Sequence, residues 1–163
     1  LPVVVHTPAA KKGSKEGMLK SKVEEGHVPT ERQLPAETAK LDATKIDVEI
    51  ADEVGLDHEQ VIVDHADGTN VDYVMAETDC YLSFSIGVEW LRGVGPETVA
   101  AAIEEYGSDR IMIDSDLNGC LYADRFGMKR TILDLLRLGV DHEDVRAVAY
   151  ENQKEALGLD HLP

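Results

Sequence analysis

The 163-residue sequence is poor in cysteine, in aromatic side chains and in positive charge. Its two cysteines, Cys80 and Cys120, stand far apart and outside any C-x-x-C spacing, which argues against a zinc knuckle or a redox pair. We expect them to be idle thiols in a reducing compartment. No apolar run approaches the roughly 18 residues that a membrane-spanning helix needs. These shortages favour a cytoplasmic protein without a membrane partner.

Positive charge is scarce: 16 basic residues oppose 32 acidic ones, for a net charge of −16. Such a charge repels nucleic acid at ordinary ionic strength, so nucleic acid is expected at most as a substrate. Acidic surfaces also keep a protein hydrated when salt screens its charges, which favours a halophilic source. The exception is the segment 11–32, which carries six basic and four acidic residues.

Short apolar runs alternate with helix-like segments along the chain, which is typical of a parallel sheet in an α/β protein. Strands are predicted at 2–6, 61–65, 81–86 and 110–114. Helices are predicted at 37–54, over the apolar positions Val71, Val74 and Met75, at 96–107, over the face Met128, Ile132, Leu135 and Leu136, and at 141–158. The first helix is expected to bury Ala39, Ala43, Ile46, Ile50 and Val54. We expect one domain, 1–163, interrupted by a long loop at about 7–36.

Four strands alone would leave the apolar run 3–5 at a sheet edge, where it invites pairing with another chain. Half of an eight-stranded barrel explains this run better than an open sheet does. We therefore predict half of a (β/α)8 TIM barrel.

Polar residues follow three of the predicted strands directly. His6 ends V-V-V-H, His65 follows V-I-V-D, and Asp114 and Asp116 end I-M-I-D-S-D. Because parallel strands carry their chemistry at their carboxyl ends, these side chains are expected to meet. Two histidines and a carboxylate suit a divalent metal (zinc, manganese, nickel or magnesium) that activates a water molecule. The alternative is that each strand-end histidine only hydrogen-bonds a loop carbonyl.

Two further carboxylates flank His65 and admit two interpretations. Asp64 and Asp67 are candidates to accept a hydrogen bond from the histidine and so orient it. For Asp67, support of the turn at Gly68 is an equally good interpretation.

The chain resembles the C-terminal half of the TatD-like metal-dependent hydrolases of the amidohydrolase superfamily. The resemblance rests on V-V-V-H-T-P, V-I-V-D-H-A-D, R-I-M-I-D-S-D and the closing Y-E-N-Q-K-E-A-L-G-L, and it omits only the loop 7–35. It implies a TIM barrel in which His6, His65 and Asp116 hold the metal. Asp114 becomes a flanking carboxylate, and Asn152 matches an Asn of the last helix, where it is expected to act as a structural cap.

The same resemblance implies that further ligands, an H-x-H pair and a metal-bridging residue, belong to a missing N-terminal half. The chain is then expected to be a truncated sequence, one half of a split enzyme or a product of gene decay. Association of identical copies of the chain into a homo-oligomer is the other way in which the half barrel could gain a partner.

The basic segment follows a strand directly, so in a barrel it hangs over the catalytic face. Lys11, Lys12 and Lys15 are candidates to steer an anionic substrate, and a solvated insertion is the equally weighted alternative. Arg92, on the loop after the third strand, is a further candidate for lining a pocket.

Our first hypothesis is a TatD-type hydrolase whose metal-bound hydroxide attacks a phosphoester or a carbonyl centre, with Asp116 orienting that water or accepting its proton. A lactonase or amidase is the close alternative on substrate. A non-catalytic α/β module, docking on a partner through its first strand, is the alternative from another class.

Overall fold

The computed structural model describes residues 2–6, 39–86, 94–116, 126–159 and 161. Four strands form one sheet in the order β1-β2-β3-β4, and every neighbouring pair is parallel. The strands are β1 (Val3–His6), β2 (Val61–Asp64), β3 (Tyr81–Ser85) and β4 (Ile111–Asp114). The predicted α/β class and all four predicted strands are thus confirmed, and the half barrel stays a prediction.

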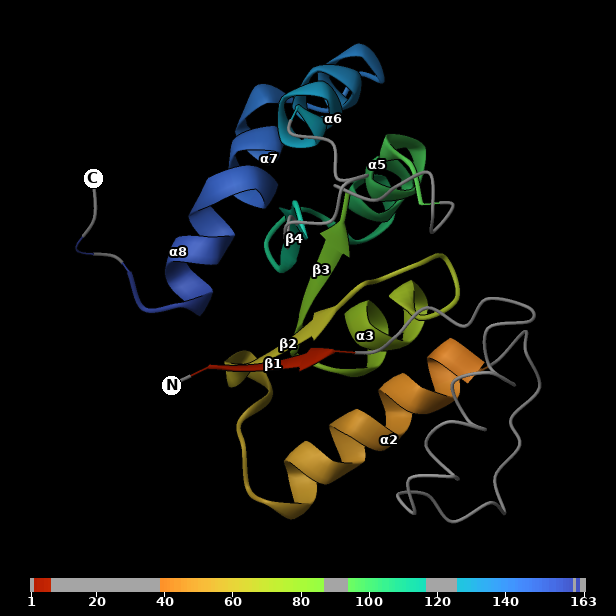
Figure 1. Ribbon diagram of the computed structural model, residues 1–163, viewed down its shortest axis with the longest axis vertical. Helices are drawn as coiled ribbons and strands as arrows, with labels where there is room; N and C mark the ends of the chain where they lie inside the picture. The colour runs from red at the N-terminus through yellow and green to blue at the C-terminus, as the bar shows by residue number, and fades with distance from the viewer. Residues whose placement is uncertain (1, 7–38, 87–93, 117–125, 160, 162–163) are drawn as a thin grey trace.

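Helices connect the strands, as parallel pairing requires. They are α2 (Ala39–Glu53), the short η1 (His58–Gln60), α3 (Val71–Glu77), α5 (Pro96–Tyr106), α6 (Gly127–Arg137), α7 (His142–Arg146), the π-helical turn η2 (Ala147–Glu151) and α8 (Asn152–Ala156). In Figure 1, α2, α3 and α5 follow one another along one side of the sheet, and α7 and α8 lie beyond β4. None of the helices in the described ranges is long and apolar enough to cross a membrane.

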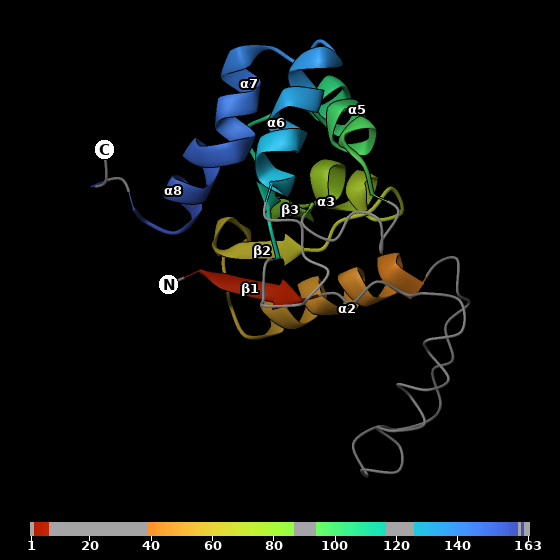
Figure 2. The ribbon, with the colours of Figure 1, turned by 45° about the horizontal axis from the view of Figure 1, so that its top comes forward.

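The two faces of the sheet have different neighbours, because side chains alternate along a strand. Val63, Phe84 and Ile113 point into the main core, where they meet Val74 of α3 and Val99 of α5. Figure 2 shows these helices stacked over that side of the strands. The opposite face carries a second small cluster, formed by Ile62, Tyr81 and Met112 with Ala156 of α8.

Helix α2 confirms the predicted helix but buries a different face. Ile50 and Val54, expected in the core, are 51% and 67% exposed, whereas Thr44 is fully buried. The hydroxyl of Thr44 donates to the carbonyl of Lys40 and accepts from Asn70 Nδ2. A buried hydroxyl with two partners costs little, which lets a polar position face the core. In α6, Leu136 is likewise exposed rather than buried.

The two outer strands, β1 and β4, differ in how their outer edges are covered. On β1, Val3 and Val4 are 39% and 55% exposed, as expected for an apolar edge. Beside β4, the Nδ2 of Asn152 donates to Ile111 O at 2.7 Å and the Nε2 of Gln153 donates to Ile113 O at 3.0 Å. The carbonyls of Arg110 and Asp114 accept from the backbone N–H groups of Leu82 and Ile86, on the β3 side. The amides of Asn152 and Gln153 therefore bond the outer edge of β4. Asn152 therefore has a structural role, but its side chain bonds the edge of β4 and does not cap a helix.

Candidate functional site at the carboxyl ends of the strands

Polar side chains from three neighbouring strands meet at the carboxyl end of the sheet. Asp64 ends β2, Ser85 ends β3 and Asp114 ends β4, and Ser85 pairs with Asp114 in register. His65 follows Asp64 directly and is 3% exposed. We call Asp64, His65, Ser83, Ser85 and Asp114 the strand-end cluster. Its position is the one in which parallel α/β sheets hold their functional residues.

The backbone at His65 explains how two consecutive residues reach the same cluster. Successive side chains of a strand point to opposite faces, so an extended His65 would face away from Asp64. Instead, His65 has a φ of 58°, in the left-handed region. This conformation costs a non-glycine residue roughly 1–2 kcal/mol and tends to persist where function requires it. Asp116, two residues beyond Asp114, also has a positive φ, of 41°.

Ser85 is 2% exposed, and its hydroxyl lies at the centre of the cluster. Its Oγ is 2.5 Å from His65 Nδ1, 3.1 Å from Asp64 Oδ1 and 3.2 Å from Asp114 Oδ2. Ser83, on the same face of β3, donates to Asp114 Oδ2 at 2.7 Å. Ser85 therefore links His65 to the carboxylates of Asp64 and Asp114, whereas the hydrogen bond of Ser83 goes to Asp114.

Burial raises the pKa of the Asp114 carboxyl above its ordinary value, and the nearby Asp64 carboxylate raises it further. Hydrogen bonds from Ser83 and from the backbone N–H of Asp116 oppose this shift, because they stabilise the ionised form. Asp114 therefore holds a proton more readily than an exposed aspartate does.

The predicted metal ligands are placed as follows. His6 stands in β1 opposite Asp64 in register, and its side chain lies outside the described part of the structure. Asp116 is half-buried, and its backbone N–H donates to Asp114 Oδ1 at 2.9 Å. Among the described side chains, no three from His, Cys, Asp or Glu are gathered as a metal-binding group. The ligand set His6, His65 and Asp116 remains a prediction.

One pair of atoms in the cluster does fit a divalent metal. His65 Nε2 is 3.3 Å from Asp64 Oδ2. Metal bonds of about 2.0–2.2 Å to nitrogen and oxygen set two ligands of a tetrahedral ion roughly 3.4 Å apart. The other ring nitrogen, Nδ1, contacts the Ser85 hydroxyl, which is how metal-binding histidines are usually oriented. The donor types and this spacing suit zinc or a similar ion, and they equally suit an ion pair between a protonated His65 and Asp64.

Two other predictions near the site can be placed. Asp67 Oδ1 accepts from the backbone N–H and the hydroxyl of Thr69, so it supports the turn rather than His65. The candidates Lys11, Lys12, Lys15 and Arg92, together with the loop 7–36, lie outside the described residues.

Ser83 and Ser85 are members of the cluster that sequence reasoning missed. The available signal was their alternation in Y-L-S-F-S, which puts both hydroxyls on one face of a strand whose neighbours end in acidic residues. Serine alone is too common at strand ends to indicate a site. Only the register between β3 and β4 shows that Ser85 stands beside Asp114.

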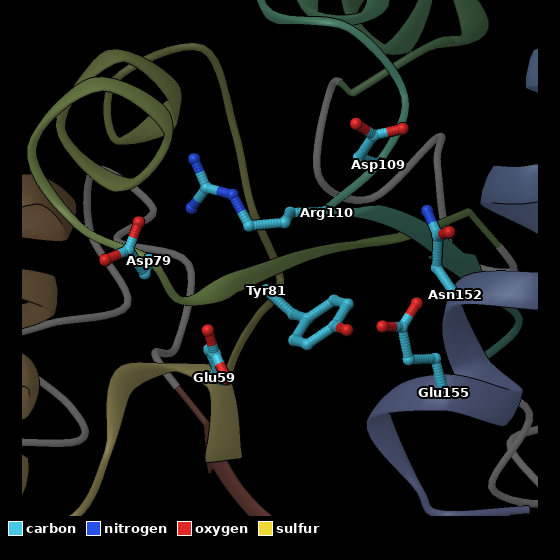
Figure 3. A pocket seen from close by; sticks show the side chains of 7 residues that line it. All are labelled: Glu59, Asp79, Tyr81, Asp109, Arg110, Asn152 and Glu155. Atoms are coloured by element: carbon cyan, nitrogen blue, oxygen red, sulfur yellow. The ribbon is translucent and has the colours of Figure 1, made fainter.

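A cavity of about 520 Å³ lies at the opposite, amino end of the strands. Its lining comprises Glu59, Asp79, Tyr81, Asp109, Arg110, Asn152 and Glu155. Figure 3 shows the Tyr81 hydroxyl pointing toward Glu155, while the Arg110 side chain extends toward Asp79. The Arg110 guanidinium donates to the carbonyls of Met75, Thr78 and Cys80. These hydrogen bonds hold the segment that precedes β3 in place. None of the predicted site residues lines this cavity.

The sequence is 27% identical over 154 residues to a protein of Methanocaldococcus jannaschii that is named an uncharacterized metal-dependent hydrolase. The match covers 94% of this chain and 48% of that protein, so the chain spans about half the length of the curated relative it matches. Comparison with protein-family models gives no match. No solved structure matches the chain either.

Proposed function

We propose that this chain forms part of a metal-dependent hydrolase of the TatD type. The observation that carries the proposal is the strand-end cluster, in which His65 Nε2 and Asp64 Oδ2 have the spacing of two ligands of one ion. The named function of the distant relative supports the same class of enzyme.

His65 and Asp116 would hold the metal together with His6, which stands opposite Asp64 on the neighbouring strand. A divalent ion held there would lower the pKa of a water molecule to about 7 and would polarise the bond to be cleaved. Asp64 Oδ2, which is 3.3 Å from His65 Nε2, would be a further candidate ligand. Asp116 would orient the water or accept its proton, and Asp114 Oδ1 accepts a hydrogen bond from the Asp116 backbone N–H and so holds it in place.

The proposed substrate is a phosphoester, with a nucleic-acid end as one form of it and a lactone or amide as the alternative. Lys11, Lys12, Lys15 and Arg92 are the proposed contacts to its negative charge. Since the chain carries a net charge of −16, an anionic substrate needs such a local excess of positive charge to approach the site.

We further propose that the four strands are the C-terminal half of a (β/α)8 barrel. Its support is the all-parallel sheet, the helices along its outer side and the length of the relative. A closed barrel also needs a strand beside β4, at the edge where Asn152 and Gln153 donate to carbonyl oxygens. The proposal therefore requires α8 to leave that edge when the other half is present.

The decisive experiment measures binding of Zn²⁺, Mn²⁺ and Ni²⁺ by calorimetry, together with cleavage of bis(p-nitrophenyl) phosphate. His65→Ala and Asp116→Asn should each weaken metal binding at least tenfold and abolish any metal-dependent cleavage. His142→Ala, at an exposed position that begins α7, is the matched control and should change neither. Metal binding that is undetectable, or that survives His65→Ala unchanged, would refute the proposal.

A non-catalytic assembly module is the second candidate, favoured by the exposure of Val3 and Val4 on β1. An apolar edge strand of this kind is a template for pairing with another chain. Sedimentation should then show dimers that dissociate on dilution and on Val4→Lys, without any requirement for metal. A chain that is monomeric at all concentrations would remove this candidate.

A further inference from the structure

The contacts of the Ser85 hydroxyl restrict how His65 can be protonated. The hydroxyl carries one hydrogen, yet its oxygen lies within 3.2 Å of one ring nitrogen and two carboxylate oxygens. Ionised carboxylates only accept hydrogen bonds. When the hydroxyl donates to a carboxylate, the hydrogen between Ser85 and His65 must come from Nδ1. That arrangement leaves Nε2 as the nitrogen that faces Asp64 Oδ2.

Two lone-pair atoms 3.3 Å apart repel each other unless a positive charge lies between or beside them. Two species supply that charge: a second hydrogen on the ring, donated from Nε2 to Asp64 Oδ2, and a metal ion bound at Nε2 in place of that hydrogen. In both of them Nδ1 donates to Ser85. In the opposite tautomer, the hydroxyl donates to Nδ1 and its oxygen lone pairs face both carboxylates. That tautomer also places a hydrogen on Nε2, which blocks a metal at this atom.

We propose that Ser85 is the positioning residue of the metal site, because it accepts the His65 Nδ1 hydrogen and thereby presents Nε2 to the metal. The inference rests on the proposed function, since it concerns the same site. Ser85 acts through the histidine and through Asp64, whose Oδ1 accepts the hydroxyl hydrogen. One buried hydroxyl thus orients both halves of the pair that has metal-ligand spacing.

The fold favours this role for Ser85 over the other polar groups nearby. Ser85 ends a strand that is buried along its whole length, so its Cβ cannot shift far. Ser83 is buried on the same face of the same strand and donates to the same Asp114 Oδ2. Ser83 differs from Ser85 because its hydrogen bond goes to Asp114 and not to His65, which makes it a matched control.

The experiment compares Ser85→Ala with Ser83→Ala and uses Ser85→Thr as the variant that restores a hydroxyl. The first readout is the ¹⁵N and ¹H NMR signal of the His65 ring, recorded with and without Zn²⁺. The second is Zn²⁺ affinity by calorimetry, with thermal unfolding as the check that each variant is folded. We expect a slowly exchanging Nδ1 hydrogen on His65 in the parent chain and in Ser83→Ala, and its loss in Ser85→Ala.

Zn²⁺ affinity should fall about 10–100-fold in Ser85→Ala, the usual effect of removing the partner of a metal-binding histidine, and should recover in Ser85→Thr. Ser83→Ala should change it less than about threefold. An Nδ1 hydrogen that is absent from the parent chain, or unaffected by Ser85→Ala, would overturn the inference even if metal binds. If no metal binds but the Nδ1 hydrogen depends on Ser85, the proposed function fails while the positioning role stands.

Discussion

Asn152 offers a direct test of how the last helix is held on the sheet. Its side chain is 5% exposed, and its Nδ2 donates to Ser108 O and Ile111 O, each at 2.7 Å. Replacing Asn152 with Ala leaves two carbonyl oxygens without this donor. Ser108 O still accepts from the backbone N–H of Ile111, whereas Ile111 O loses its donor. One unsatisfied buried carbonyl costs about 1–3 kcal/mol and one lost hydrogen bond about 1 kcal/mol, so the loss should be about 2–4 kcal/mol. That is a large part of the roughly 5–15 kcal/mol that stabilises a typical domain.

Asn152→Asp separates hydrogen bonding from packing, because aspartate has nearly the same size but places an acceptor where the donor was. It should destabilise the chain at least as much as Asn152→Ala. Both variants would be measured by urea unfolding followed by circular dichroism, with Glu143→Gln on the exposed side of α7 as the control. The control should lie within about 0.5 kcal/mol of the parent chain. An Asn152→Asp variant as stable as the parent chain would refute the reasoning.

Three further predictions concern other parts of the molecule. Arg110→Lys should lower the free energy of unfolding by about 2–4 kcal/mol, because an ammonium group cannot replace the bonds to Met75 O, Thr78 O and Cys80 O; an unchanged urea midpoint would contradict this. Burial raises the pKa of the Cys80 thiol, so the native chain should react slowly with iodoacetamide. In a Cys120→Ser background at pH 8, modification of Cys80 should be at least about tenfold slower in the native chain than in the urea-unfolded chain. Equal rates would contradict this prediction. The net charge of −16 should make the melting temperature rise between 0.05 and 1 M NaCl, and a flat profile would argue against the halophilic interpretation.

The fold class followed from local pattern because each strand is a short, nearly continuous apolar run between helical segments. The strand limits agree with the structure to within one residue, since β-branched residues such as Val61 and Val63 are buried on the helix-facing side of the sheet. The same reasoning chose the wrong face for α2. Apolar spacing pointed to Ile50 and Val54, but Thr44 faces the core because Lys40 O and Asn70 satisfy its hydroxyl.

The last helical segment shows a similar limit. Its apolar face around Val145 and Val148 was predicted, and both residues are buried. The π-helical turn η2 was not predicted, because no residue between Ala147 and Glu151 is specific to that geometry. This turn precedes the two amides that bond the carbonyls of β4, a contact between segments about 40 residues apart.

The sequence by itself determined which end of the sheet carries the polar residues. An apolar strand that stops at His or Asp needs no partner to be recognised, and parallel strands bring such ends to one edge. Only the tertiary structure decided how the residues there meet. The positive φ of His65 turns it toward Asp64, and the register of β3 on β4 places Ser85 between the histidine and two carboxylates. Both features depend on contacts between strands, which local sequence does not encode.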